Sequence, residues 1–144
     1  MSIKLKHFVF FVITLVIIIG PVEAQLKTIY KFKKVMIPLD MEYEDTVIKK
    51  GPYDIEYLKN QAAGFYIMRI LKGRKKLCTL TGEEMYYDSM GGRQITDPTI
   101  PDEPTMKMKK NAEEQQIHFI FETGKTSSLY PFVKLRFKIG YVEE

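Results

Sequence analysis

The sequence predicts an all-β fold: a single-domain antiparallel β-sandwich of seven to nine strands. Three observations carry this prediction. Apolar and polar residues alternate with a period of two in several short runs, most clearly over residues 133–141. Turn-forming residues interrupt the chain at short intervals, as they do in sandwiches and barrels. No segment after residue 24 repeats apolar residues at i, i+3, i+4 and i+7 for three turns, as an amphipathic helix would.

Residues 1–24 are predicted to be a cleavable signal peptide. Lys4 and Lys6 form a positive n-region, and the apolar segment Phe8–Gly20 follows it. A membrane anchor takes roughly 18 or more consecutive apolar residues, so this segment is too short for one. Cleavage is expected near Ala24-Gln25, where small and apolar residues suit a signal peptidase. We therefore expect a domain of residues 25–144 without a transmembrane segment, located in the periplasm or outside the cell.

The next elements are strands on either side of a proline. Residues 27–43 alternate over part of their length and predict one or two strands. Pro38 has no N–H to donate to a ladder, so it marks an edge, a bulge or a point where the chain crosses between sheets. Residues 42–45 form an acidic turn. Residues 53–58 then alternate as a half-buried antiparallel strand, with Asp54 and Glu56 on the outer face.

A resemblance is carried by two short motifs, Ile37-Pro38-Leu39 and residues 48–53, which read Ile-Lys-Lys-Gly-Pro-Tyr. Their order resembles that of small secreted bacterial β-sandwich proteins with a Leu-Pro-Ala-Gly-x-Tyr hairpin. The resemblance covers roughly residues 35–80, and the chain departs from it by two lysines at the Pro-Ala positions and by Pro52 after the glycine. It implies a β-sandwich-like fold and no particular activity.

The centre of the fold is predicted to be a β-hairpin over Phe65–Leu80, whose two apolar runs flank a basic tip. A two-residue type II′ turn with glycine first fits Gly73-Arg74. The alternative loop, Lys72-Gly73, is less favoured because it would place Arg69 opposite Lys76, a like-charge pair. The Gly73-Arg74 turn places Lys72 opposite Lys75.

Continuing that register pairs Ile70 with Leu77 and Arg69 with Cys78. Because both faces of the hairpin are largely apolar, we expect both strands to be covered on both sides. Cys78 is the only cysteine, so it forms no internal disulfide. Its position among apolar strand residues predicts a buried, inert thiol.

The second half of the chain is predicted to hold further strands around one long loop. Gly82 indicates a bulge or a second turn before a short strand at 85–88. Residues 89–104 contain three prolines and read as a long loop, either a lid over a site or a solvated connection between sheets. Strands follow at 105–110, 117–122 and 129–142, and Pro131 suggests that the last of these begins at an edge.

Charge and residue content exclude several function classes. Removing Lys4, Lys6 and Glu23 from 22 basic and 18 acidic residues leaves 20 and 17, without the strong basic excess of a nucleic-acid-binding protein. His118 is the only histidine after residue 24, and with one cysteine it makes a poor ligand supply for zinc. We expect no metal and no cofactor.

Catalysis finds little support in the residue pattern. A serine or cysteine triad would depend on His118, and no nucleophile motif accompanies it. Asp54 and Glu56 share a strand face, and a glycosidase needs two carboxylates in one site. Alternating acidic residues, however, are usually the solvent-exposed face of an antiparallel strand. A hydrolase built on these residues is the least favoured alternative.

The residues singled out for binding are the four cations of the hairpin tip, Lys72, Arg74, Lys75 and Lys76. They suit contact with an anionic surface or an envelope component. The alternative is that they are only solvated surface residues without a binding role. The function predicted from the sequence is a non-catalytic, exported binding or envelope-associated structural module. A lipocalin- or calycin-like β-barrel that carries a small apolar ligand is the alternative.

Overall fold

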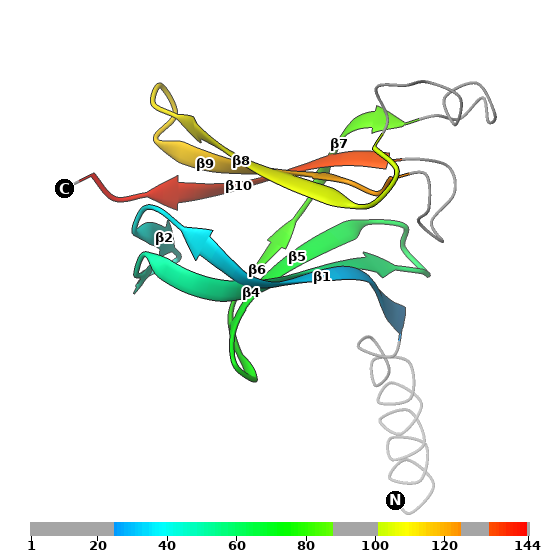
Figure 1. Ribbon diagram of the computed structural model, residues 1–144, viewed down its shortest axis with the longest axis horizontal. Helices are drawn as coiled ribbons and strands as arrows, with labels where there is room; N and C mark the ends of the chain where they lie inside the picture. Colours follow the sequence, from blue (N-terminus) through cyan, green and yellow to red (C-terminus); the bar gives the residue numbers. More distant parts are fainter. Residues whose placement is uncertain (1–24, 88–100, 125–132, 144) are drawn as a thin grey trace, which may run out of the picture.

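The computed structural model describes residues 25–87, 101–124 and 133–143, and these residues form two antiparallel sheets packed face to face (Figure 1). The prediction of an all-β sandwich is confirmed. Because the two sheets do not close on one another, the alternative of a closed barrel is wrong. The predicted signal peptide, most of the predicted loop at 89–104 and Pro131 lie outside the described residues.

Ten strands occur in the described residues. Sheet A contains, in spatial order, β1 (Leu26–Ile37), β4 (Gly51–Asn60), β5 (Tyr66–Lys72) and β6 (Lys75–Thr81). Sheet B contains, in spatial order, β3 (Thr46–Ile48), β2 (Met41–Tyr43), β10 (Val133–Tyr141), β9 (Gln116–Glu122) and β8 (Thr105–Asn111), and β7 (Glu83–Tyr87) also pairs with β10. The predicted number was seven to nine; β2 and β3, with three residues each, are too short to show an alternating pattern.

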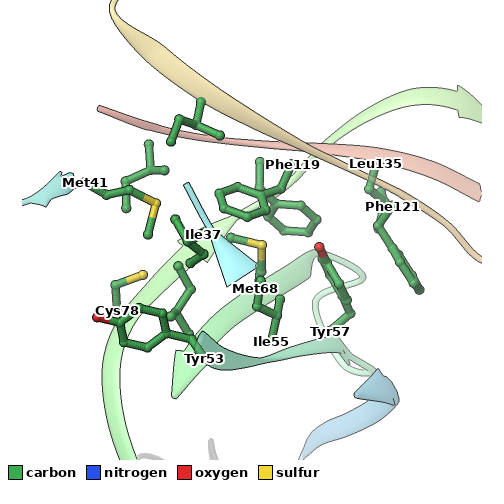
Figure 2. Packing of buried hydrophobic residues seen from close by; sticks show 14 of the residues in the cluster. Ile37, Met41, Tyr53, Ile55, Tyr57, Met68, Cys78, Phe119, Phe121 and Leu135 are labelled. Atoms are coloured by element: carbon green, nitrogen blue, oxygen red, sulfur yellow. The ribbon is translucent and has the colours of Figure 1, made fainter. Parts of the chain in front are cut away.

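The core lies between the two sheets and is built from the inward positions of each alternating strand (Figure 2). Tyr57 of β4 stacks on Phe121 of β9, with ring centroids 4.1 Å apart. Cys78 packs in this core, as predicted, and burial raises the pKa of its thiol to about 11. The thiol is therefore protonated and unreactive at neutral pH.

Two segments carry the chain from sheet A to sheet B. Pro38 stands between β1 in sheet A and β2 in sheet B, so it marks a crossing point, one of the three predicted roles. The second crossing, at Gly82 between β6 and β7, replaces the predicted bulge or turn (Figure 1). A Cβ at Gly82 would lie 2.6 Å from the ring of Phe137, so only glycine lets the backbone pass this close to β10.

The central hairpin follows its predicted turn and departs from its predicted register. Lys72 pairs with Lys75 across Gly73-Arg74, and a positive φ at Gly73 alone agrees with a type II′ turn. A register shift after this turn pairs Ile70 with Cys78 instead of Leu77. The predicted cover on both faces holds for β5 and is wrong for β6, which forms the edge of sheet A.

Candidate functional site

The tip of the β5–β6 hairpin extends beyond the body of the sandwich (Figure 1). The four residues predicted from the sequence, Lys72, Arg74, Lys75 and Lys76, are all exposed there. Within the described residues, Lys72, Arg74 and Lys75 make no ion pair, whereas Lys76 interacts within the chain. The tip therefore presents at least three cations whose charge is not offset by a bonded carboxylate.

The cross-strand pair of lysines at the tip lowers the stability of the hairpin. Lys72 and Lys75 are direct cross-strand partners, and like charges in such positions destabilise a hairpin by a few tenths of a kcal/mol. The tip lies at a surface turn, where a neutral or acidic residue would fit equally well. A basic pair in this position fits a role in contacting an anion better than a role in folding.

Two further cations lie at the same end of sheet A, and sequence reasoning missed them. Lys33 and Lys34 occupy a bulge of β1, where Lys34 adopts a φ of 52° and its backbone N–H donates to Oδ1 of Asp54 at 3.0 Å. Asp54 is the cross-strand partner of Leu71, which directly precedes Lys72. β1 and β5 are two strand spacings apart, about 10 Å. The signal available in the sequence was the Lys33-Lys34 pair, but its position depends on the β1–β4 register.

An exposed apolar side chain adjoins these cations. Met36 of β1 is 64% exposed and is the cross-strand partner of Pro52, which is also exposed. Asp54 is the nearby carboxylate, and Lys31 lies 3.9 Å from its Oδ2. We call this surface the basic end of sheet A and define it by its members: Lys33, Lys34, Met36, Lys72, Arg74, Lys75 and Lys76.

The cations of β10, in contrast, face acidic partners. Arg136 pairs with Oε1 of Glu83, and Nζ of Lys138 lies 3.7 Å from Oε2 of the same carboxylate. Lys134 lies 3.8 Å from Glu122. The side-chain hydrogen bond from Arg136 lowers the pKa of Glu83 below its ordinary value. The cations on this part of sheet B are thus paired with carboxylates of the neighbouring strands β7 and β9.

The residues considered for catalysis do not converge. Asp54 and Glu56 lie on the outer face of sheet A, where Glu56 accepts a hydrogen bond from Thr28 at 2.8 Å. His118 lies on the outer face of sheet B, with Nε2 3.6 Å from Oε2 of Glu114. Since these groups lie on opposite outer faces of the sandwich, they do not share a site.

Metal binding finds no ready site either. Residues 25–87, 101–124 and 133–143 contain no cluster of three or more His, Cys, Asp or Glu side chains suited to hold a metal ion. No helix in this described part of the chain is long and apolar enough to cross a membrane.

Comparison with known proteins found no matching family model, no matching curated protein and no matching solved structure. The candidate site therefore rests on its own geometry and charge.

Proposed function

We propose that the protein is a non-catalytic binding module that attaches to an anionic lipid surface through the basic end of sheet A. The observation that carries the proposal is the protruding tip, where Lys72, Arg74 and Lys75 are exposed and form no ion pair among the described residues. Cations without internal partners keep their full charge available to an external anion.

The expected strength of this contact is modest and additive. A lysine or arginine close to an anionic membrane contributes about 1 kcal/mol at physiological ionic strength. Three tip residues therefore supply roughly 3 kcal/mol, and Lys33 and Lys34 add to it when the same end faces the surface. The exposed Met36 beside them favours a lipid surface over a purely polar partner, because its side chain is available to enter the interface.

The remaining features agree with this role. The signal peptide predicted at residues 1–24 would deliver the domain to the envelope, where anionic lipid surfaces are present. The separation of His118 from Asp54 and Glu56 supports a function in binding without catalysis. The chain would act as a sandwich that presents its contact residues on the β5–β6 hairpin and on the neighbouring part of β1.

A vesicle partition experiment tests the proposal. The full chain and a tip variant with Lys72→Gln, Arg74→Gln and Lys75→Gln are sedimented with vesicles of phosphatidylcholine, with or without phosphatidylglycerol. Lys76 is retained because it interacts within the chain. Any contribution of residues 1–24 is shared by all variants and cancels in the comparison. We expect the tip variant to lose about 100-fold in partition onto the anionic vesicles, as the loss of roughly 3 kcal/mol requires.

The matched control carries Lys134→Gln, Arg136→Gln and Lys138→Gln on β10, which changes net charge by the same amount. Because these cations are paired with Glu83 and Glu122, the control is expected to bind within about threefold of the wild type. Equal losses for both variants would mean that net charge alone drives binding. Binding of the wild type to polyglutamate, without binding to the anionic vesicles, would instead identify an acidic polypeptide as the partner. Either result would contradict the proposal.

A further inference from the structure

A cavity of about 280 Å³ opens at the end of the sandwich where β1 leaves sheet A. Its apolar wall consists of Pro38, Leu39 and Val142. The polar groups at its wall belong to Lys50, Lys110, Tyr141 and Glu143. Strands of sheet B and the segments that connect the two sheets therefore contribute to one cavity, whose size suits a small molecule at the lower end of ligand sites.

Lys110 faces this cavity because of its position in the β8 ladder. It pairs with Ile117, an inward-facing core residue of β9, whereas Lys109 pairs with His118 on the outer face. The ammonium group of Lys110 lies 4.9 Å from the ring centroid of Tyr141. A cation–π contact with Tyr141 thus holds Lys110 on the inward-facing side of β8, at the end of the sandwich where the cavity opens.

The charges at the cavity favour an anion. Two lysines, Lys50 and Lys110, line it against one carboxylate, that of Glu143. Lys50 already interacts within the chain and its charge acts on Asp40, so Lys110 is the main cation that the cavity offers to a ligand. The Tyr141 hydroxyl donates to Oε1 of Glu143 at 3.4 Å, so that carboxylate already has a donor. The neighbouring Asp40 is also engaged: it accepts a hydrogen bond from the backbone N–H of Lys50, which lowers the pKa of its carboxyl group.

The walls of the cavity are fixed by backbone hydrogen bonds. The N–H of Lys50 donates to Oδ1 of Asp40 at 2.8 Å, and the N–H of Val142 donates to the carbonyl of Asp40 at 2.9 Å. The N–H of Tyr141 donates to the carbonyl of Gln115 at 3.2 Å. These bonds tie the end of β10 to the segment between β1 and β2, so the cavity is formed before any ligand enters.

We infer that this cavity is a binding site for a small organic anion, a carboxylate with a short apolar chain. The carboxylate binds the ammonium group of Lys110, on the side of the cavity lined by Lys50, and the chain contacts Pro38, Leu39 and Val142. The site uses none of the cations of the tip. It therefore goes beyond the proposed attachment to a surface and does not depend on it.

Titration of the full chain with hexanoate, followed by amide chemical shifts, tests the inference. We expect shifts concentrated at Leu39, Lys50, Lys110 and Val142, with weaker binding of the matched probes hexanol and hexylammonium. Lys110→Gln is expected to weaken hexanoate binding about 10-fold, the effect of losing one charge-assisted contact. The control Lys109→Gln removes the same charge from the opposite face of β8 and is expected to change affinity less than twofold.

Three results would overturn the inference: no shift at the cavity in millimolar hexanoate, equal binding of hexanol or hexylammonium, or equal weakening by Lys109→Gln and Lys110→Gln. The vesicle experiment keeps the two proposals separate. The tip variant is expected to bind hexanoate like the wild type, and Lys110→Gln is expected to bind anionic vesicles like the wild type. Loss of hexanoate binding in the tip variant would point to general charge instead of the cavity and would also overturn the inference.

Discussion

The basic residues of the β5–β6 tip and those of β10 differ in what lies opposite them. On β10, Arg136 and Lys138 both face Glu83, which the crossing at Gly82 brings to the neighbouring strand β7. At the tip, Lys72 faces Lys75. The three cations of β10 thus have carboxylate partners, whereas Lys72, Arg74 and Lys75 form no ion pair among the described residues. A cluster of basic residues becomes a candidate contact only when the fold leaves it without counter-ions.

Gly82→Ala is expected to have the largest effect on stability. The added methyl group would overlap the buried ring of Phe137, and overpacking of this kind costs about 1–3 kcal/mol. The same change would move Glu83 away from Arg136 and remove the counter-ion that distinguishes β10 from the tip. Denaturant unfolding measures the loss. Gly140→Ala is the control, since its new Cβ would meet no atom closer than 3.7 Å and should be nearly neutral.

Replacing a lysine by glutamate is expected to change the stability of the fold in opposite directions in the two regions. Lys75→Glu converts a like-charge cross-strand pair with Lys72 into an attractive one and should stabilise the fold by roughly 0.2–1 kcal/mol. It should also weaken binding to anionic vesicles. Lys138→Glu places a second carboxylate beside Glu83 and should destabilise the fold. Thermal unfolding of both variants measures the two changes in stability. If both variants were stabilised or both destabilised, the two regions would not differ in the way proposed.

A smaller effect is expected from Glu83→Gln, and it should depend on pH. Because the hydrogen bond from Arg136 lowers the folded-state pKa of Glu83 from its ordinary 4.5, the ionised carboxylate stabilises the folded protein. This contribution is complete above pH 4.5 and disappears as the pH falls through the lowered pKa. The wild type should therefore exceed the variant in stability at neutral pH and match it in strong acid. A difference that persists in acid would mean that the pair is not the cause.

The sequence predicted those parts of the fold that local pattern determines. The alternation of β10 and the Gly73-Arg74 turn were predicted from short stretches of residues, and the crossing near Pro38 was one of three roles predicted for that proline. The crossing at Gly82 was not, because it depends on the ring of Phe137, more than fifty residues away. The register shift that aligns Ile70 with Cys78 likewise depends on how the hairpin packs in the core.

The candidate site followed the same division. The four cations of the tip are adjacent in sequence and were visible from it. Lys33 and Lys34 join them only through the pairing of β1 with β4 and of β4 with β5. The cavity could not be anticipated, since Lys50 lies in the connection between β3 and β4 while Lys110 lies in β8, and only the folded arrangement brings these two parts of the chain to one cavity.

Hydrogen exchange of the protein bound to anionic vesicles is the most direct test of the central claim, that the tip makes the contact. The account predicts slower amide exchange over residues 72–76 on phosphatidylglycerol-containing vesicles, with exchange over residues 133–141 unchanged. Slower exchange over β10, or bound protein with unchanged exchange at the tip, would contradict it.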